Sequence, residues 1–267
     1  MNYLGRIIGV IIGFRFGGIF GALFGLWLGY QFDKRFSLGK ASASHEAKQA
    51  RFFKSAFRVM GHMAKMDGTV SRAEIKQAEA IMRKLNLTSD KTREAQELFR
   101  QGKKDTFNLD DEMQKFSFMV GKRSSLAMMF LEIQINFALA DGKIDGVERE
   151  VLLKICGYLG IPQILFDQLV SMLIAASSFG TGGTYSGSGQ TGGFNKPSID
   201  KAYAVLGVKK TDTETVIKRA YRKLLSQHHP DKLQAKGLPD EMIKMAADKT
   251  HEIRQAYELI RKERGFA

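Results

Sequence analysis

The first thirty residues are apolar almost without interruption, and this feature constrains the fold more than any other. Between Leu4 and Phe32 only Arg6 and Arg15 carry a charge. As a helix rising 1.5 Å per residue, this stretch is about 40 Å long, whereas a bilayer's hydrocarbon core is about 30 Å thick. A helix in a soluble core seldom stays apolar on every face for so long. Residues 1–32 are therefore predicted to form a transmembrane helix, with the lipid bilayer as a partner.

Glycine recurs at every fourth position through this stretch. Because glycine lowers helix propensity, an unbroken row at this spacing indicates a packing role. In lipid, small residues four apart form a groove that lets two helix backbones approach closely. We expect self-association, as a homodimer, through the glycine row Gly5, Gly9, Gly13, Gly17, Gly21, Gly25 and Gly29. The alternative is a helix that is merely rich in small residues.

Basic residues are concentrated just after the predicted span. Five lie between Lys34 and Arg51, whereas only Arg6 lies near the N-terminal end. The positive-inside rule then places the short N-terminus outside and the remaining chain in the cytoplasm. A cleaved signal peptide is the alternative, because Ala41-Ser42-Ala43 looks like a cleavage site. The apolar run, however, is too long for a signal sequence.

Net charge and cysteine content narrow the possible functions. The 267 residues carry a net charge of +13 and a single cysteine, Cys156. One cysteine excludes an intrachain disulfide framework and any multi-cysteine zinc site. Because Cys156 lies in an apolar helical run, we expect it to be buried. The basic charge favours acidic partners, which include nucleic acid, anionic lipid and acidic protein surfaces.

Apolar residues recur at helical spacing through residues 46–176, which are predicted to form an all-helical domain. Within it, Ala64–Glu74 and Ala138–Glu148 repeat one pattern, in which a helix ends at Asp-Gly and the next starts with Ser/Asp-x-x-Glu. That last element is a capping box, whose side chains satisfy free N–H groups of the first turn. The carboxylates could instead hold a cation, but their spacing lacks the alternation of a calcium loop. We expect capping and no metal; the carboxylates concerned are Asp67, Glu74, Asp141, Asp145 and Glu148.

Residues 177–197 consist mainly of glycine, serine and threonine, too few apolar groups to fold. They are predicted to form a flexible linker with a reach of about 25 Å, which leaves the C-terminal part mobile. Residues 199–267 then predict a small helical domain. A helix opening at Thr213-Glu214 ends at His229-Pro230, because a residue before proline avoids the α region. An exposed loop is expected to lead from there to a helix starting near Pro239.

Two resemblances follow from these motifs. The Asp-Gly-x-hydrophobic-Ser/Asp-x-x-Glu pattern resembles the TerB-like helical domain of tellurite-resistance proteins, which implies an interaction module. The blocks Asp200–Val208, Ile217–Leu224, His229–Asp231 and Ala256–Glu258 resemble, in order, the J domain of DnaJ-type co-chaperones. With the span and the linker, the whole chain is similar to the family of membrane-anchored DnaJ-like proteins of Gram-negative bacteria, which implies an inner-membrane location.

The resemblance implies a regulatory co-chaperone that binds a DnaK-type chaperone and stimulates its ATPase. The residues it implies are the trigger His229, Pro230 and Asp231 and the docking face Lys218, Tyr221, Arg222 and Lys223. We expect no active site, so no catalytic residue, and no cofactor. One departure from the family is Thr250 in place of a frequent aromatic residue, so Met242 or Met245 is expected to fill that part of the core.

Other functions remain as alternatives. Adjacent histidines, His228 and His229, seldom converge on one metal ion, so no metal is expected there. The basic helix lacks base-stacking aromatic residues, so nucleic acid is not expected as a partner. A membrane scaffold or envelope-stress sensor acting through the middle domain is the alternative function.

Overall fold

Every described stretch of the chain is built from helices and turns, as the sequence predicts, and these residues contain no strand. The computed structural model describes residues 7, 11, 26–28, 44–66, 78–83, 85–139, 142–179 and 198–266. The chain divides into two compact units, Met1–Lys48 and Gln49–Ala267. The glycine row and most of the predicted transmembrane helix lie outside the described residues. Within the described part, no helix combines the length and apolar character needed to cross a membrane.

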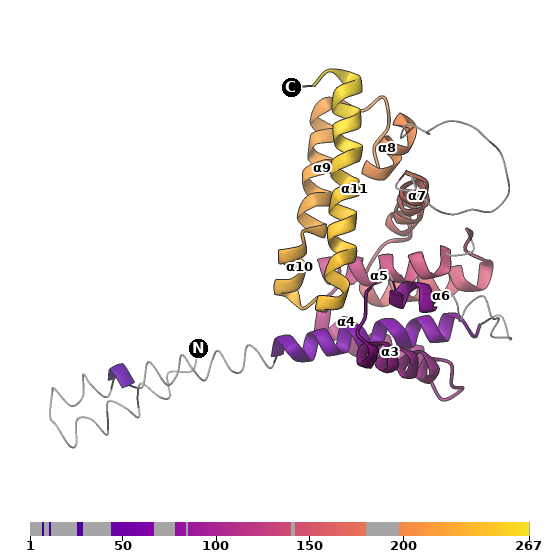
Figure 1. Ribbon diagram of the computed structural model, residues 1–267, viewed down its shortest axis with the longest axis vertical. Helices are drawn as coiled ribbons and strands as arrows, with labels where there is room; N and C mark the ends of the chain where they lie inside the picture. Colours follow the sequence, from indigo (N-terminus) through magenta and orange to yellow (C-terminus); the bar gives the residue numbers. More distant parts are fainter. Residues whose placement is uncertain are drawn as a thin grey trace. The chain divides into compact units, whose positions relative to one another are not determined.

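The middle domain is a bundle of helices (Figure 1), one of which is almost wholly buried. After helical residues 44–63 and 78–83 come α3 (Ser89–Gly102), α4 (Leu109–Val120), α5 (Ser125–Ala138), α6 (Gly146–Leu159) and α7 (Gln163–Phe179). α5 contacts α4, α6 and α7, and all its residues from Leu126 to Ala138 except Asn136 are buried. Phe130 of α5 packs against Phe116, with ring centroids 4.2 Å apart, and edge-on against Phe52 at 5.7 Å. α5 is therefore the centre of the core.

The described helix ends are satisfied by the side chains that the sequence places there. The side chains of Thr88, Asn108, Ser124 and Asp145 each accept a hydrogen bond from a backbone N–H in the first turn of the following helix. Asp145 and Glu148 form the complete predicted capping box, and Gly142 has a φ of 86° in the turn before it. Residues 67–74 of the first copy of the repeat, with Asp67 and Glu74, lie outside the described residues, as does Asp141.

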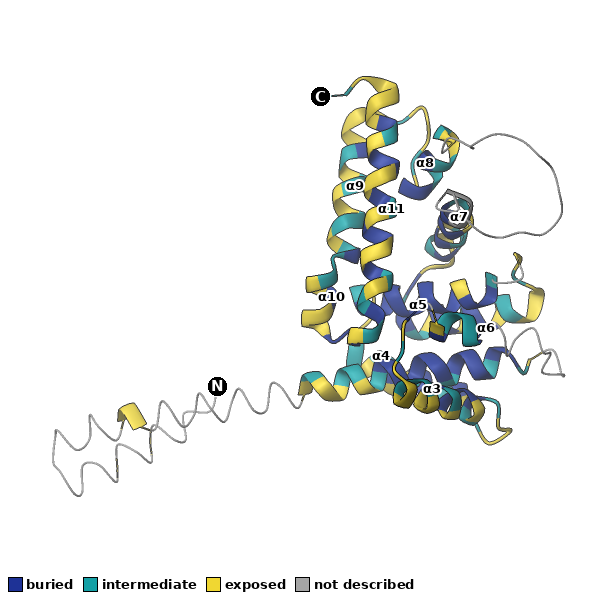
Figure 2. Ribbon diagram, viewed as in Figure 1, coloured by how far each residue is buried: buried dark blue, intermediate teal, exposed yellow. Residues whose placement is uncertain are grey.

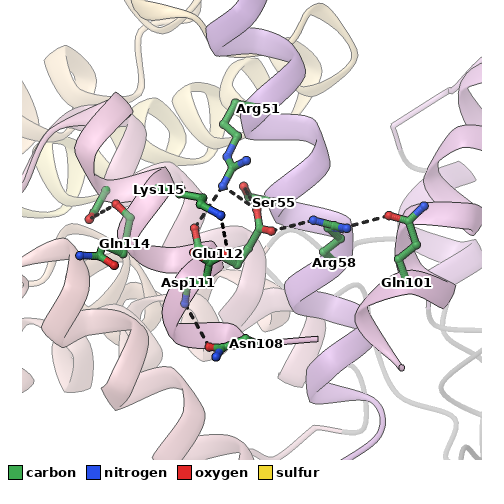
Figure 3. A network of polar contacts seen from close by, with 10 residues as sticks. Arg51, Ser55, Arg58, Gln101, Asn108, Asp111, Glu112, Gln114 and Lys115 are labelled. Atoms are coloured by element: carbon green, nitrogen blue, oxygen red, sulfur yellow. Dashed lines mark hydrogen bonds and ion pairs between the residues drawn. The ribbon is translucent and has the colours of Figure 1, made fainter. Parts of the chain in front are cut away.

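A buried carboxylate ties three helices of the bundle together (Figure 3). Glu112 of α4 is 4% exposed and accepts hydrogen bonds from Ser55 Oγ at 2.7 Å and Arg58 Nη1 at 2.9 Å. Arg51 Nη2 lies 3.2 Å from the same carboxylate, and Arg58 also donates to Gln101 of α3. Because a buried charge is tolerated only when it is paired and hydrogen-bonded, this network fixes how helix 44–63 lies against α3 and α4.

Two glycines let helix 44–63 and α3 approach each other unusually closely. A methyl group built on Gly61 would lie 2.9 Å from the carbonyl carbon of Phe99 and closer still to its oxygen. A methyl group on Gly102 would meet the backbone of Arg58 in the same way, 2.7 Å from its carbonyl carbon. Each glycine thus faces the backbone of the other helix, and only hydrogen fits at either position.

The C-terminal domain contains one helix more than the sequence predicts. It comprises α8 (Ile199–Leu206), α9 (Glu214–His228), α10 (Pro230–Lys236) and α11 (Asp240–Arg264). α11 packs on α8 and α9. Buried and exposed positions alternate along α11 (Figure 2), and its buried residues include Ile253, Tyr257 and Ile260. The predicted ends of α9 and start of α11 are confirmed. The expectation of an irregular loop between them is wrong, because Pro230 opens the short helix α10.

The C-terminal domain is packed against the middle domain within the unit Gln49–Ala267. α7 continues to Phe179, past the predicted domain end at 176, and packs against α8. Ala176 of α7 belongs to the core of the C-terminal domain, and Leu233, Leu238, Met242 and Ala246 belong to that of the middle domain. Residues 180–197 of the predicted linker lie outside the described residues. The two domains thus share apolar cores, a packing that the linker's composition did not predict.

Candidate functional site

The junction between α9 and α10 carries the His-Pro-Asp motif. His229 has extended backbone angles, φ −61° and ψ 120°, and it is both the C-cap of α9 and the N-cap of α10. The extended conformation follows from Pro230, whose ring disfavours the α region for the preceding residue. Pro230 itself suits the first position of α10, where no N–H partner is needed. The tripeptide thus forms a sharp, defined corner between two helices.

The Asp231 side chain projects from this corner into solvent. It is exposed in the first turn of α10, where the helix dipole favours a negative charge. Within the described part of the chain the Asp231 side chain makes no hydrogen bond or ion pair. Its neighbour Lys232 donates to Ser226 Oγ at 2.9 Å and so links α10 back to α9. A free carboxylate on a fixed backbone is well suited to receive an arginine or lysine of another molecule.

The two histidines at the junction have different surroundings. His228 is 4% exposed, and its Nε2 lies 3.4 Å from Glu132 Oε1 of α5. His229 is half-buried, and its Nδ1 has no hydrogen-bond partner in the described structure. The two rings thus differ in burial and in their partners. Among the described residues no group of three or more metal-ligating side chains occurs, here or elsewhere.

Thr250 supports the junction from α11. It is buried, and its hydroxyl lies 3.0 Å from the backbone oxygen of His228 and 2.9 Å from that of Ala246. The small polar side chain therefore holds the end of α9 by a hydrogen bond. Met242 is fully buried and Met245 partly buried, but both pack with the middle-domain core. The expectation that Met242 or Met245 fills the core of the C-terminal domain in place of the aromatic residue is therefore wrong.

The predicted docking face of α9 contains residues of two kinds. Arg222 and Lys223 are exposed, as is Arg219, and the described structure contains no ion pair of theirs. Lys218 is half-buried and pairs with Glu214 one turn earlier. Tyr221 stacks on Tyr257 of α11, with ring centroids 4.0 Å apart and 9° between the planes. Arg222 and Lys223 thus remain available to a partner, whereas Tyr221 also holds α9 against α11.

One residue near the junction was missed by reasoning from the sequence. Glu132 is 4% exposed in the middle of α5 and contacts His228 across the domain boundary. A glutamate flanked by Leu131 and Ile133 is the signal that could have identified it, since an acid in an apolar run requires a partner.

The only cysteine is not a candidate nucleophile. Cys156 of α6 is 2% exposed, and burial raises the pKa of its thiol to about 12 from the ordinary value of 9.0. Because the thiolate is the reactive form, such a thiol is inert near neutral pH. The buried position predicted from the sequence is confirmed.

A basic helix that ends at His-Pro-Asp and packs on a long partner helix defines a J domain, the class of modules by which co-chaperones act. Residues 201–265 match the DnaJ domain family, residues 54–170 match the tellurite resistance protein TerB family, and residues 1–50 match the co-chaperone DjlA transmembrane domain family. The co-chaperone protein DjlA of Salmonella paratyphi A is 47% identical over 272 residues, and that of Escherichia coli K12 is 46% identical over 274 residues. The DjlA of Vibrio cholerae is 43% identical over 283 residues; all three alignments cover 100% of both chains. No solved structure matches the chain.

The chain therefore belongs to the DjlA family of membrane-anchored J-domain co-chaperones. The three predicted parts, the membrane anchor, the TerB-like domain and the J domain, occur in the predicted order.

Proposed function

We propose that this co-chaperone binds a DnaK-type chaperone through α9 and the His-Pro-Asp corner and stimulates its ATP hydrolysis. The observation that carries the proposal is the exposed carboxylate of Asp231, which has no side-chain partner in the described structure and lies on the helix that follows α9 with its exposed cations Arg222 and Lys223. A site with both signs of charge in fixed positions is suited to a partner with the complementary arrangement.

The basic face and the corner have separate tasks. Arg219, Arg222 and Lys223 attract an acidic surface of the chaperone and orient the encounter, so the association rate should fall as salt is added. Lys218 and Tyr221 complete this face, although Tyr221 also stacks within the J domain. Once docked, Asp231 accepts charge-assisted hydrogen bonds from a cation of the chaperone, and His229 and Pro230 hold the corner in shape.

We further propose that the protein has no catalytic activity of its own. The ATPase belongs to the chaperone, and the J domain contributes binding and orientation. We also propose that the anchor crosses the inner membrane once, with the short N-terminus in the periplasm and both helical domains in the cytoplasm. This orientation rests on the five basic residues that follow the anchor. We also propose that the protein self-associates through the glycine row and that its partner is a protein rather than nucleic acid.

The experiment is steady-state ATP turnover by a DnaK-type chaperone, measured with the full chain in detergent or lipid vesicles. Asp231→Asn keeps the shape of the side chain and removes the charge, so stimulation should be lost while helicity is unchanged. Glu263→Gln is the matched control, because it removes an exposed charge at the C-terminal end of α11, next to Arg264, which donates to the backbone oxygen of Asp212 in the turn before α9. Wild-type stimulation by Asp231→Asn would overturn the proposed role of the corner.

A further inference from the structure

The His-Pro-Asp corner rests on the TerB-like middle domain. Immediately behind it, His228 of α9 faces Glu132 of α5, with 3.4 Å between Nε2 and Oε1. On α10, Leu233 is fully buried in the middle-domain core, and Lys236 Nζ donates to Ser125 Oγ at 2.9 Å. The elements that set the position of the corner thus contact the middle domain directly.

The turn that leaves α10 is held in the same way. Gln49 of helix 44–63 donates its side-chain amide to the backbone oxygen of Leu238 at 3.1 Å, and Leu238 is fully buried. Met242 and Ala246, in the first turns of α11, also lie in the middle-domain core. The contact therefore involves Leu233 in the middle of α10, Lys236 at its C-terminal end and Leu238 in the turn that follows, and it leaves the first turn with Asp231 exposed.

Within the described structure, the Glu132 carboxylate is paired with a residue of the J domain, His228. A carboxylate that is 4% exposed on an apolar helix is costly unless another group compensates it. The described contact of its carboxylate is with His228, whereas Asn136 donates only to the Glu132 backbone oxygen. Its other charged neighbours are Asp248, Lys249 and Glu252 of α11, which line a cavity of about 110 Å³ together with Glu132. Lys249 pairs with Glu252 at 3.2 Å.

We propose that the middle domain is part of the working co-chaperone, with Glu132 as a positioning residue that acts through His228. The pair holds the end of α9, and with it α10, in the orientation that presents Asp231 and the basic face together. This inference rests on the proposed function, in which the corner triggers the chaperone. It assigns to the TerB-like domain a direct effect on J-domain activity, beyond the role of spacer between membrane and J domain.

The test compares two buried glutamates in the full chain. Glu132→Gln removes the charge that faces His228. Glu112→Gln removes a charge with the same 4% exposure that is paired only inside the middle domain, with Arg51 and Arg58. If Glu132 positions the corner, Glu132→Gln should raise the co-chaperone concentration needed for half-maximal ATPase stimulation by about 5–10-fold, the lower range of site-to-site coupling. The ATPase rate of the chaperone at saturating co-chaperone should be unchanged. Glu112→Gln should need the same concentration for half-maximal stimulation as the wild type, when equal amounts of folded protein are compared.

A second readout does not depend on the chaperone. Amide hydrogen exchange in α10 should be about tenfold faster in Glu132→Gln, which corresponds to a coupling of ~1.4 kcal/mol. One amide to follow is the Leu233 N–H, which donates to the His229 oxygen. His228→Gln removes the other member of the same pair. The double variant Glu132→Gln/His228→Gln should therefore show no faster exchange in α10 than either single variant. Equal effects of Glu132→Gln and Glu112→Gln would mean a purely structural role and overturn the inference, as would unchanged exchange in α10. If the wild type does not stimulate the chaperone, the proposed function is overturned, and the exchange readout still decides separately whether Glu132 positions α10.

Discussion

Adding a single methyl group at the crossing of helix 44–63 and α3 should measurably weaken the protein. In Gly61→Ala the new carbon would lie 2.9 Å from the Phe99 carbonyl carbon, and backbone atoms cannot rotate out of the way. The two helices must therefore separate, which disturbs the adjacent Arg58–Glu112 pair. Overpacking of this kind costs about 1–3 kcal/mol, and the upper end applies because the obstacle is backbone. Alanine recovers about 1 kcal/mol of helix propensity, so the net loss should be about 2 kcal/mol.

Gly157→Ala is the matched control. Gly157 is exposed on α6 and an added methyl group would meet nothing within 4 Å, so only the propensity gain remains. In a domain of about 150–250 residues, 1 kcal/mol shifts Tm by about 2–4 °C. Thermal unfolding of the full chain in detergent, followed by near-UV circular dichroism, should show Gly61→Ala about 4–8 °C below wild type and Gly157→Ala about 2–4 °C above it. A Gly61→Ala variant as stable as Gly157→Ala would refute the close crossing.

Two further predictions concern the thiol and the membrane anchor. Because burial raises the pKa of Cys156 to about 12, the folded protein should resist alkylation by iodoacetamide at pH 8, and labelling should start only on unfolding. Rapid labelling of the folded protein at pH 8 would contradict this prediction. The same raised pKa stabilises the folded state below pH 9, and this stabilisation is lost as the pH rises through about 12. In the anchor, replacing Gly13, Gly17 and Gly21 by leucine should weaken self-association in a two-hybrid assay of residues 1–32, since leucine fills the predicted groove. Unchanged association would mean that the glycine row is not the interface.

Local features could be predicted from the sequence because their causes lie within a few residues. The capping box of Asp145 and Glu148, the end of α9 before Pro230 and the buried position of Cys156 all follow from neighbouring residues. The anchor, the TerB-like domain and the J domain were also recognisable in order, because each has its own periodicity or motif.

What could not be predicted depends on partners distant in the chain. α10 was missed because its seven residues carry little helical periodicity, and it is held by burying Leu233 against another domain. The role of Thr250 depends on its hydrogen bond to the backbone oxygen of His228, twenty-two positions away in the chain. The Glu132–His228 contact joins residues ninety-six positions apart, and no local pattern encodes such a pairing.

The connection between α7 and α8 has a thermodynamic consequence. The glycine-rich linker predicted for residues 177–197 would hold the two modules that it joins at an effective concentration in the millimolar range. Docking of the J domain on the middle domain is therefore a first-order equilibrium that does not depend on how much protein the membrane contains. With an effective concentration of about 1 mM, an intrinsic dissociation constant of about 0.1 mM keeps roughly ten molecules docked for each undocked one. At that dissociation constant, a competitor for the same surface would have to overcome about 1.4 kcal/mol to release half of the J domains.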